Sequence, residues 1–163
     1  MHLPVLLFFL LAFHIPIFSI PVDVSIIKSP VQLGRHLEIL VPEKNDTGIE
    51  AIISDTNKDK WLPVNSDIPS FGMNDSEHWV RVTLQNTSAF PEKIVFESDA
   101  TWIDKVDFFF PVSDANKITH YEFESAGDLI PFSAWKTQHR NPVFRSTIAP
   151  KSEETFYFCY KTQ

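Results

Sequence analysis

Short apolar runs separated by Pro, Asn, Asp or Gly follow one another along most of this chain. Runs of this length that are rich in Val, Ile, Phe and Tyr and bounded by turn-forming residues are typical of β-strands. The predicted strands are Arg35 to Val41, His78 to Gln85, Glu92 to Ser98, Ile103 to Phe110, Lys117 to Glu124, Val143 to Ile148 and Thr155 to Lys161. Because no long helical pattern lies between them, the sequence predicts an all-β protein that folds as a sandwich or a barrel.

One short helix is the only helix that the pattern predicts. The segment Thr47-Gly48-Ile49-Glu50 has the spacing of a capping box, in which a Thr and a Glu three residues later satisfy the first backbone N–H groups. The isoleucines that follow would lie on one face of such a helix. We therefore expect a short helix near Ile49 to Ile53.

The first 20 residues differ from the rest, because they are apolar almost throughout from Leu3 to Ile20. Their apolar centre, Val5 to Phe13, has the length of a signal-peptide core and is shorter than the roughly 20 residues of a spanning helix. We expect residues 1–20 to be a signal peptide and residues 21–163 to form one extracytoplasmic β-sandwich domain. The segment lacks basic residues and a good cleavage site, so an uncleaved anchor or a buried strand of a cytoplasmic protein is the alternative.

Composition excludes two classes of protein. Hydrophobic residues make up 44% of the chain and aromatic residues 13%, which is too apolar for an intrinsically disordered protein. Lys and Arg number 14 against 21 Asp and Glu, giving a net charge of −7 without a block of like charge. Binding to nucleic-acid phosphates is therefore not expected.

No catalytic or metal-binding motif is present in the sequence. The six histidines have no close ligand spacing, and the four glycines form neither a phosphate-binding loop nor a nucleophile elbow. The single cysteine, Cys159, lies among aromatic residues, which predicts a packed strand thiol and excludes an intramolecular disulfide. We predict no catalytic residues, no metal and no cofactor, although a hydrolase with two carboxylates cannot be recognised from spacing.

Alternation along His78 to Gln85 assigns the two faces of this strand. Val80, Val82 and Leu84 point one way, and Trp79 and Arg81 point the other way. The aliphatic side should be core, so the indole and the guanidinium lie on the second face. Either they form part of a binding surface, or Trp79 packs under a loop and Arg81 pairs with a carboxylate. The full predicted core is Val80, Val82, Leu84, Phe144, Ile148, Phe156 and Phe158.

Five segments resemble, in their order, one family of receptor domains. They are Phe71 to Asn86, Trp102 to Phe109, Gly127 to Ser133, His139 to Phe144 and Ala149 to Tyr157. The first contains a Phe-Gly pair followed by a Trp-x-Arg strand that ends in Asn. This pattern resembles the type-two extracellular domain of seven-transmembrane receptors with diverse intracellular signalling modules, over roughly residues 33–162.

The resemblance implies a jelly-roll sandwich similar to galactose-binding and carbohydrate-binding modules, displayed outside the inner membrane and followed by a membrane-spanning region. It also implies that the Pro-Phe-Ser and His-Arg segments lie near the Trp-x-Arg strand. The predicted ligand-binding residues are Trp79, Arg81, Trp135, His139 and Arg140. Trp135 and Cys159 stand where the family often has Arg, which would alter a site for an anionic ligand.

The sequence favours two functions over a hydrolase, which also stays open. The first is a periplasmic sensor domain of a bacterial membrane receptor, which is not an enzyme and binds a small polar ligand such as a carbohydrate. Indole stacks on the flat faces of sugars, and guanidinium donates hydrogen bonds to hydroxyl groups. The alternative is an exported interaction or structural sandwich without a small ligand. For the predicted site residues, the alternative is that Arg81 and Arg140 form structural ion pairs with carboxylates such as Asp104 or Asp107.

Overall fold

The structure of this protein is a computed structural model that describes residues 20–43, 48–69, 77–99, 103–113 and 119–161. Its larger sheet has the strand order β3-β2-β4-β9-β6-β7, and β1 joins the edge of β4 in parallel, beyond the residues that pair with β2. The strands are β1 (Val22–Asp23), β2 (Glu38–Leu40), β3 (Leu62–Pro63), β4 (His78–Asn86), β6 (Lys105–Ser113), β7 (Thr119–Ala126) and β9 (Ser152–Lys161).

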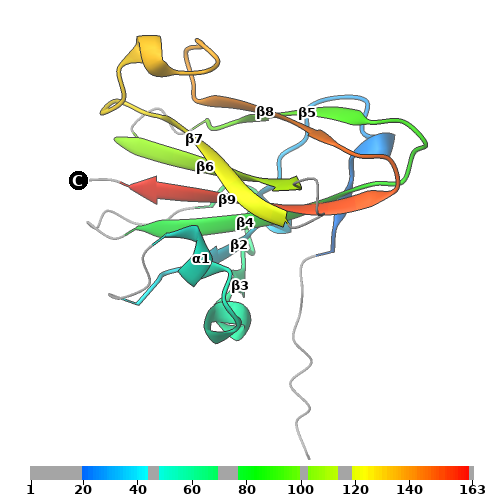
Figure 1. The fold of residues 1–163 in the computed structure, drawn as a ribbon, viewed down its shortest axis with the longest axis horizontal. Coiled ribbons are helices and arrows are strands. Elements are labelled where there is room, and N and C mark those ends of the chain that lie inside the picture. The colour runs from blue at the N-terminus through cyan, green and yellow to red at the C-terminus, as the bar shows by residue number, and fades with distance from the viewer. Residues whose placement is uncertain (1–19, 44–47, 70–76, 100–102, 114–118, 162–163) are drawn as a thin grey trace, which may run out of the picture.

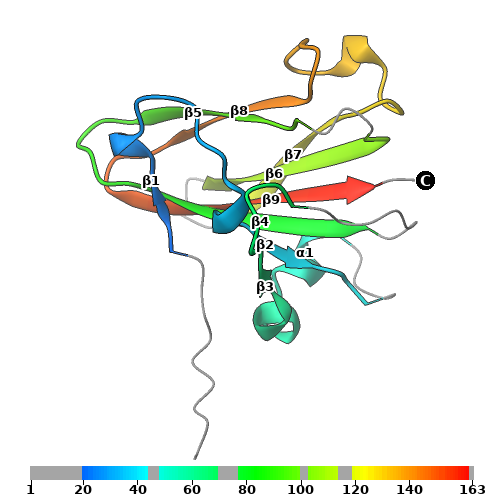
Figure 2. The same cartoon turned by 180° about the vertical axis from the view of Figure 1, so that it is seen from behind.

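A second sheet of two antiparallel strands, β5 (Glu92–Glu97) and β8 (Val143–Ile148), lies over one face of the larger sheet (Figures 1 and 2). Aromatic rings fill the space between them: the Phe96 ring centroid lies 5.4 Å from that of Phe108 and 5.2 Å from that of Phe158. Each of the seven residues predicted as core is buried in this cluster. The predicted all-β sandwich is therefore confirmed, while the jelly-roll connectivity stays a prediction.

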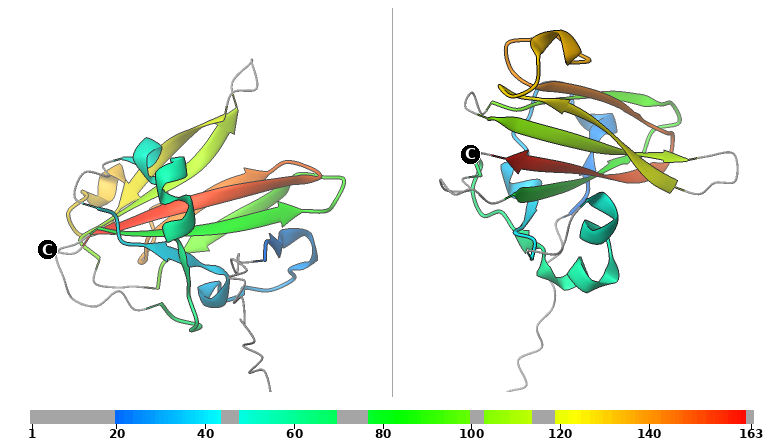
Figure 3. Two further views of the ribbon diagram at one scale, coloured as in Figure 1. Left: turned by 90° about the horizontal axis from the view of Figure 1, so that it is seen from below. Right: turned by 60° about the vertical axis from the view of Figure 1, so that its left-hand side comes forward.

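The opposite face of the larger sheet carries a second core, because a helical segment covers it (Figure 3). This segment contains α1 (Ile49–Ile52) and the 3₁₀ helix η3 (Asp55–Lys60). Ile49, Ile52 and Trp61 from the segment are buried against Trp79 and other residues of the sheet. Both faces of the large sheet are thus covered, and only one of them by another sheet.

The predicted helix is confirmed as α1, which starts at Ile49, but its N-cap residue is not the predicted Thr47. Gly48 is its N-cap with φ at +83°, a left-handed conformation that favours glycine, and no side chain caps it. Thr47, the first residue of the predicted capping box, lies outside the described residues. Besides η3, the described chain forms the 3₁₀ helices η1 (Val24–Ile26), η2 (Gly34–His36) and η4 (Phe132–Ala134), which the sequence pattern did not predict.

The seven predicted strands are all present, with shifted ends. The first is shorter than predicted, at three residues, and the last begins three residues earlier, at Ser152. Residues 117 and 118 of the predicted strand Lys117 to Glu124 lie outside the described residues. β1 and β3 were not predicted, because two residues are too few to show alternation.

Candidate ligand-binding pocket

Trp79 lies on the face of β4 that alternation predicted, and that face is buried. Its side chain is 2% exposed, and its ring centroid is 5.1 Å from that of Phe109. The segment that contains α1 and η3 covers it, so no open binding surface exists around Trp79 in the described structure. Of the two interpretations from the sequence, the structure has the one in which Trp79 packs under another segment.

Arg81 forms a partly buried ion pair on the same face. Its Nε and Nη2 donate to the two carboxylate oxygens of Glu38 at 2.8 and 3.1 Å, a bidentate arrangement. The guanidinium carbon also lies 4.5 Å from the centre of the Trp61 ring, within cation–π distance. Arg81 therefore pairs with a neighbouring carboxylate, which is Glu38 and neither Asp104 nor Asp107.

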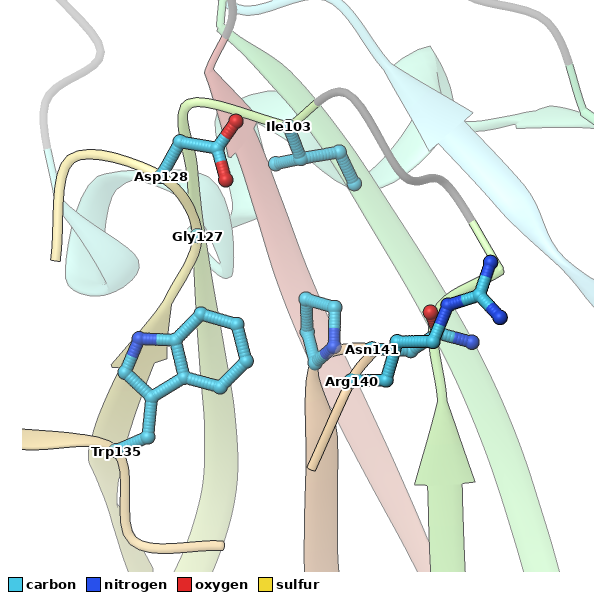
Figure 4. Close-up of a pocket in the computed structure, with 7 residues that line it drawn as sticks. Ile103, Gly127, Asp128, Trp135, Arg140 and Asn141 are labelled. Atoms are coloured by element: carbon cyan, nitrogen blue, oxygen red, sulfur yellow. The ribbon is translucent and has the colours of Figure 1, made fainter. Parts of the chain in front are cut away.

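A pocket of about 210 Å³ opens at one end of the sandwich (Figure 4). Figure 4 shows Trp135 on one side, Arg140 and Asn141 on the other, and Ile103 with Asp128 above them. Ile103 is buried, Trp135 is half-buried, and Asp128 and Arg140 are exposed. The lining residues are Ile103, Gly127, Asp128, Trp135, Arg140, Asn141 and Pro142.

Trp135 is held in place by contacts from the turn that follows β7. Its indole Nε1 donates to the Ile130 carbonyl at 3.1 Å, and its ring centroid lies 5.4 Å from that of Phe132. The next residue, Lys136, pairs with Glu124 of β7 at 3.2 Å and lies over the Phe110 ring of β6. The indole is therefore fixed to the large sheet although it is only half-buried.

Asp128 follows Gly127 at the end of β7, in a turn that only glycine fits. Gly127 has φ at +124°, and a Cβ there would lie 2.6 Å from the Asp104 carbonyl oxygen. The Asp128 N–H donates to the Ile103 carbonyl at 3.0 Å. The Asp128 carboxylate stays exposed, and the described residues provide it with no ion-pair partner.

The second wall of the pocket leads into β8. Asn141 Nδ2 donates to a carboxylate oxygen of Glu97 at 2.7 Å, and the Ser98 N–H donates to the Pro142 carbonyl at 3.0 Å. Arg140 is exposed, its side chain extends away from Trp135 in Figure 4, and no carboxylate in the described ranges pairs with it. Asp128 and Arg140 are thus charged groups at the pocket that are available to a ligand.

The five residues predicted to share one surface separate into two groups. Trp135 and Arg140 line the pocket, and His139 lies next to it, where its Nδ1 accepts a hydrogen bond from the Asn141 N–H at 3.3 Å. Trp79 and Arg81 lie on the opposite face of the large sheet, so the predicted proximity is wrong. Ligand binding by the pocket residues stays a prediction.

Sequence reasoning missed four pocket residues with side chains that a ligand could contact: Ile103, Asp128, Asn141 and Pro142. A signal for them existed, because each lies in a segment that carries the family resemblance. Asp128 directly follows a glycine, and Asn141 precedes a proline, so neither lies in a predicted strand. They line the same pocket only because the folded chain brings these three segments together.

Cys159 adds no reactive group to this domain. The thiol is 1% exposed, and burial raises its pKa from 9.0 to about 12. The prediction of a packed strand thiol is confirmed. Within the described ranges, no three His, Cys, Asp or Glu residues are grouped so that they could hold a metal ion.

The fold and the pocket together define a β-sandwich with a small, polar-rimmed cavity at one end. The family model for the 7TMR-DISM extracellular 2 domain matches residues 34–163. The chain belongs to this family and is an extracellular sensor domain of a membrane receptor, located outside the cytoplasm. No curated protein sequence matches the chain. In the part of the chain that the structure describes, no helix is long and apolar enough to cross a membrane.

Proposed function

We propose that this domain binds a small polar ligand, such as a carbohydrate, in the pocket between Asp128, Trp135 and Arg140. In this role it is the periplasmic sensor of a bacterial signal-transduction receptor, exported by residues 1–20 and connected to a membrane-spanning region. It acts as a binding module and not as an enzyme. The family supports the sensor role, and the pocket supports the ligand.

The observation that carries the proposal is that two charged side chains lie near the fixed indole of Trp135 without an ion-pair partner in the described structure. Asp128 and Arg140 have no ion-pair partner among the described residues, whereas Arg81 is fully engaged by Glu38. A carboxylate accepts hydrogen bonds from hydroxyl groups, and a guanidinium donates to them. An aromatic ring with an apolar face adds a stacking surface. These groups suit a ligand with several hydroxyl groups and a flat apolar face.

The size of the pocket favours a small ligand. Its volume of about 210 Å³ is below the range of roughly 300–1,000 Å³ that is usual for drug-sized ligands. A single sugar ring or an amino acid fits this scale better than an oligosaccharide. A concave site with an aromatic ring and an arginine also favours a small ligand over a protein partner, which would need a flat apolar patch.

Calorimetric titration with a panel of monosaccharides, disaccharides and amino acids tests the proposal. We expect at least one compound to bind the full chain, and Trp135→Ala and Arg140→Ala each to weaken it by about tenfold, the equivalent of roughly 1.4 kcal/mol. Arg145→Ala is the matched control, because Arg145 is exposed on β8 and does not line the pocket. If no compound binds, or if both pocket variants bind as tightly as the control, the proposal is wrong.

A further inference from the structure

We infer that the pocket is coupled to the C-terminal end of β9, so that a molecule held between its walls changes the stability of the backbone at Tyr160 and Lys161. The inference rests on the proposed function in taking this pocket as the ligand site. It goes further because it names the position in the chain where occupancy has its effect.

The first wall, formed by Gly127 and Asp128, cannot move independently of the start of β6. Asp128 N–H and Leu129 N–H donate to the carbonyls of Ile103 and Asp104 at 3.0 and 2.8 Å. The Gly127 backbone lies so close to Asp104 and Lys105 that a Cβ would be 2.8 Å from the Lys105 Cα. A displacement of this wall therefore displaces the first residues of β6.

The start of β6 is paired with the end of β9. Lys105 is opposite Lys161, and Val106 is opposite Tyr160, in an antiparallel ladder. Figure 1 shows the C-terminal end of β9 at the same end of the molecule as the loops after β7. Lys161 is further held by an ion pair with Glu77 at 2.5 Å. The first wall thus reaches Lys161 through one backbone hydrogen-bond network.

The second wall reaches the neighbouring residue of β9 by a different route. Pro142 accepts a hydrogen bond from the Ser98 N–H, and the Ser98 side chain is hydrogen-bonded to the Tyr160 hydroxyl. Burial raises the pKa of Tyr160 to about 12, and the half-buried Tyr160 side chain packs against the core between the sheets. This link connects the smaller sheet to β9.

The two walls are attached to different sheets, since Gly127 directly follows β7 of the larger sheet and Pro142 directly precedes β8 of the smaller one. A molecule that contacts both walls alters the spacing between the sheets at this end. Tyr160 and Lys161 are consecutive residues, and each is joined to one wall. A change in the spacing between the sheets therefore alters the backbone of β9 at these two residues. A sensor domain needs such a response at one strand end.

A covalent label tests the coupling without knowledge of the natural ligand. Asp128→Cys, modified with benzyl methanethiosulfonate, places a defined group in the pocket, while the buried Cys159 thiol stays unmodified. We expect labelling to change amide hydrogen exchange at Tyr160 and Lys161 by at least about fivefold, the lower end of usual coupling. The same label on Thr147→Cys, an exposed position of β8 that does not line the pocket, should leave both rates unchanged.

The inference is wrong if the amide exchange rates at Tyr160 and Lys161 stay within about twofold of those in the unlabelled protein. This holds even if the exchange rate of Leu129, next to the label, changes. A second variant tests the route. Tyr160→Phe keeps the ring and removes the link to Ser98, so the response to the label should fall. Tyr121→Phe is the control: it removes a hydroxyl that donates to the Thr155 carbonyl elsewhere on the sheet, so the response to the label should be unchanged. An equal response in both variants overturns the assigned route, whereas failure of the ligand panel overturns only the proposed function.

Discussion

The face of the large sheet with Trp79 and Arg81 and the end of the sandwich with Trp135 and Arg140 use the same residue types in opposite surroundings. On the sheet face, the indole is 2% exposed and the guanidinium is bound by Glu38. At the sandwich end, the indole is half-buried and the guanidinium has no carboxylate partner among the described residues. A Trp with a nearby Arg is therefore no evidence of a site by itself, because the covering segment decides whether a ligand can reach it.

Replacement of the two tryptophans should give the largest difference between the regions. Trp79→Ala removes a ring packed against Phe109 in a closed core, so we expect a loss of about 3–5 kcal/mol in the free energy of unfolding. Trp135→Ala should cost only about 1 kcal/mol, because much of that ring is already in contact with water. Urea unfolding measures both values. Equal losses, or a greater loss for Trp135→Ala, would contradict the contrast.

The arginine on the sheet face should matter for stability next. Arg81→Ala leaves the Glu38 carboxylate buried without its partner, so we expect a loss of about 3 kcal/mol. The double variant Glu38→Gln with Arg81→Met should recover part of this loss, since it removes the unpaired charge. Arg140→Ala is the matched control and should change unfolding by less than about 0.5 kcal/mol. A double variant no more stable than Arg81→Ala would argue against a penalty for the unpaired carboxylate.

A hydrogen-bonded charge at the surface should have the smallest effect. Hydrogen bonds from the hydroxyls of Thr87 and Ser25 lower the pKa of Asp23 from 3.8 to about 2. Because this pKa is lower in the folded state, the Asp23 carboxylate adds stability above about pH 4 that is lost as the pH falls towards 2. Urea unfolding between pH 2 and pH 5 should show a weaker pH dependence for Asp23→Asn, and part of that change for Thr87→Val. A wild-type pH dependence in Asp23→Asn would show that these bonds do not stabilise the fold.

The faces of the strands could be predicted from the sequence because side chains of a pleated strand alternate locally. Val80, Val82 and Leu84 lie in the core between the sheets as predicted, and Trp79 lies on the other side. The short helix near Ile49 and the buried thiol of Cys159 followed from equally local patterns. The family resemblance over roughly residues 33–162 correctly indicated a receptor sensor domain, since the family model matches residues 34–163.

The tertiary structure alone decided which of these residues could meet a ligand. Alternation shows on which side of a strand Trp79 lies, and it carries no information about the segment that covers that side. The pocket is formed by residues as far apart in sequence as Ile103 and Pro142, which meet because β6, β7 and β8 end or begin at the same end of the sandwich. Contacts between distant segments depend on strand order and loop paths, so Asp128 and Arg140 became neighbours of one cavity only when the sheets packed together.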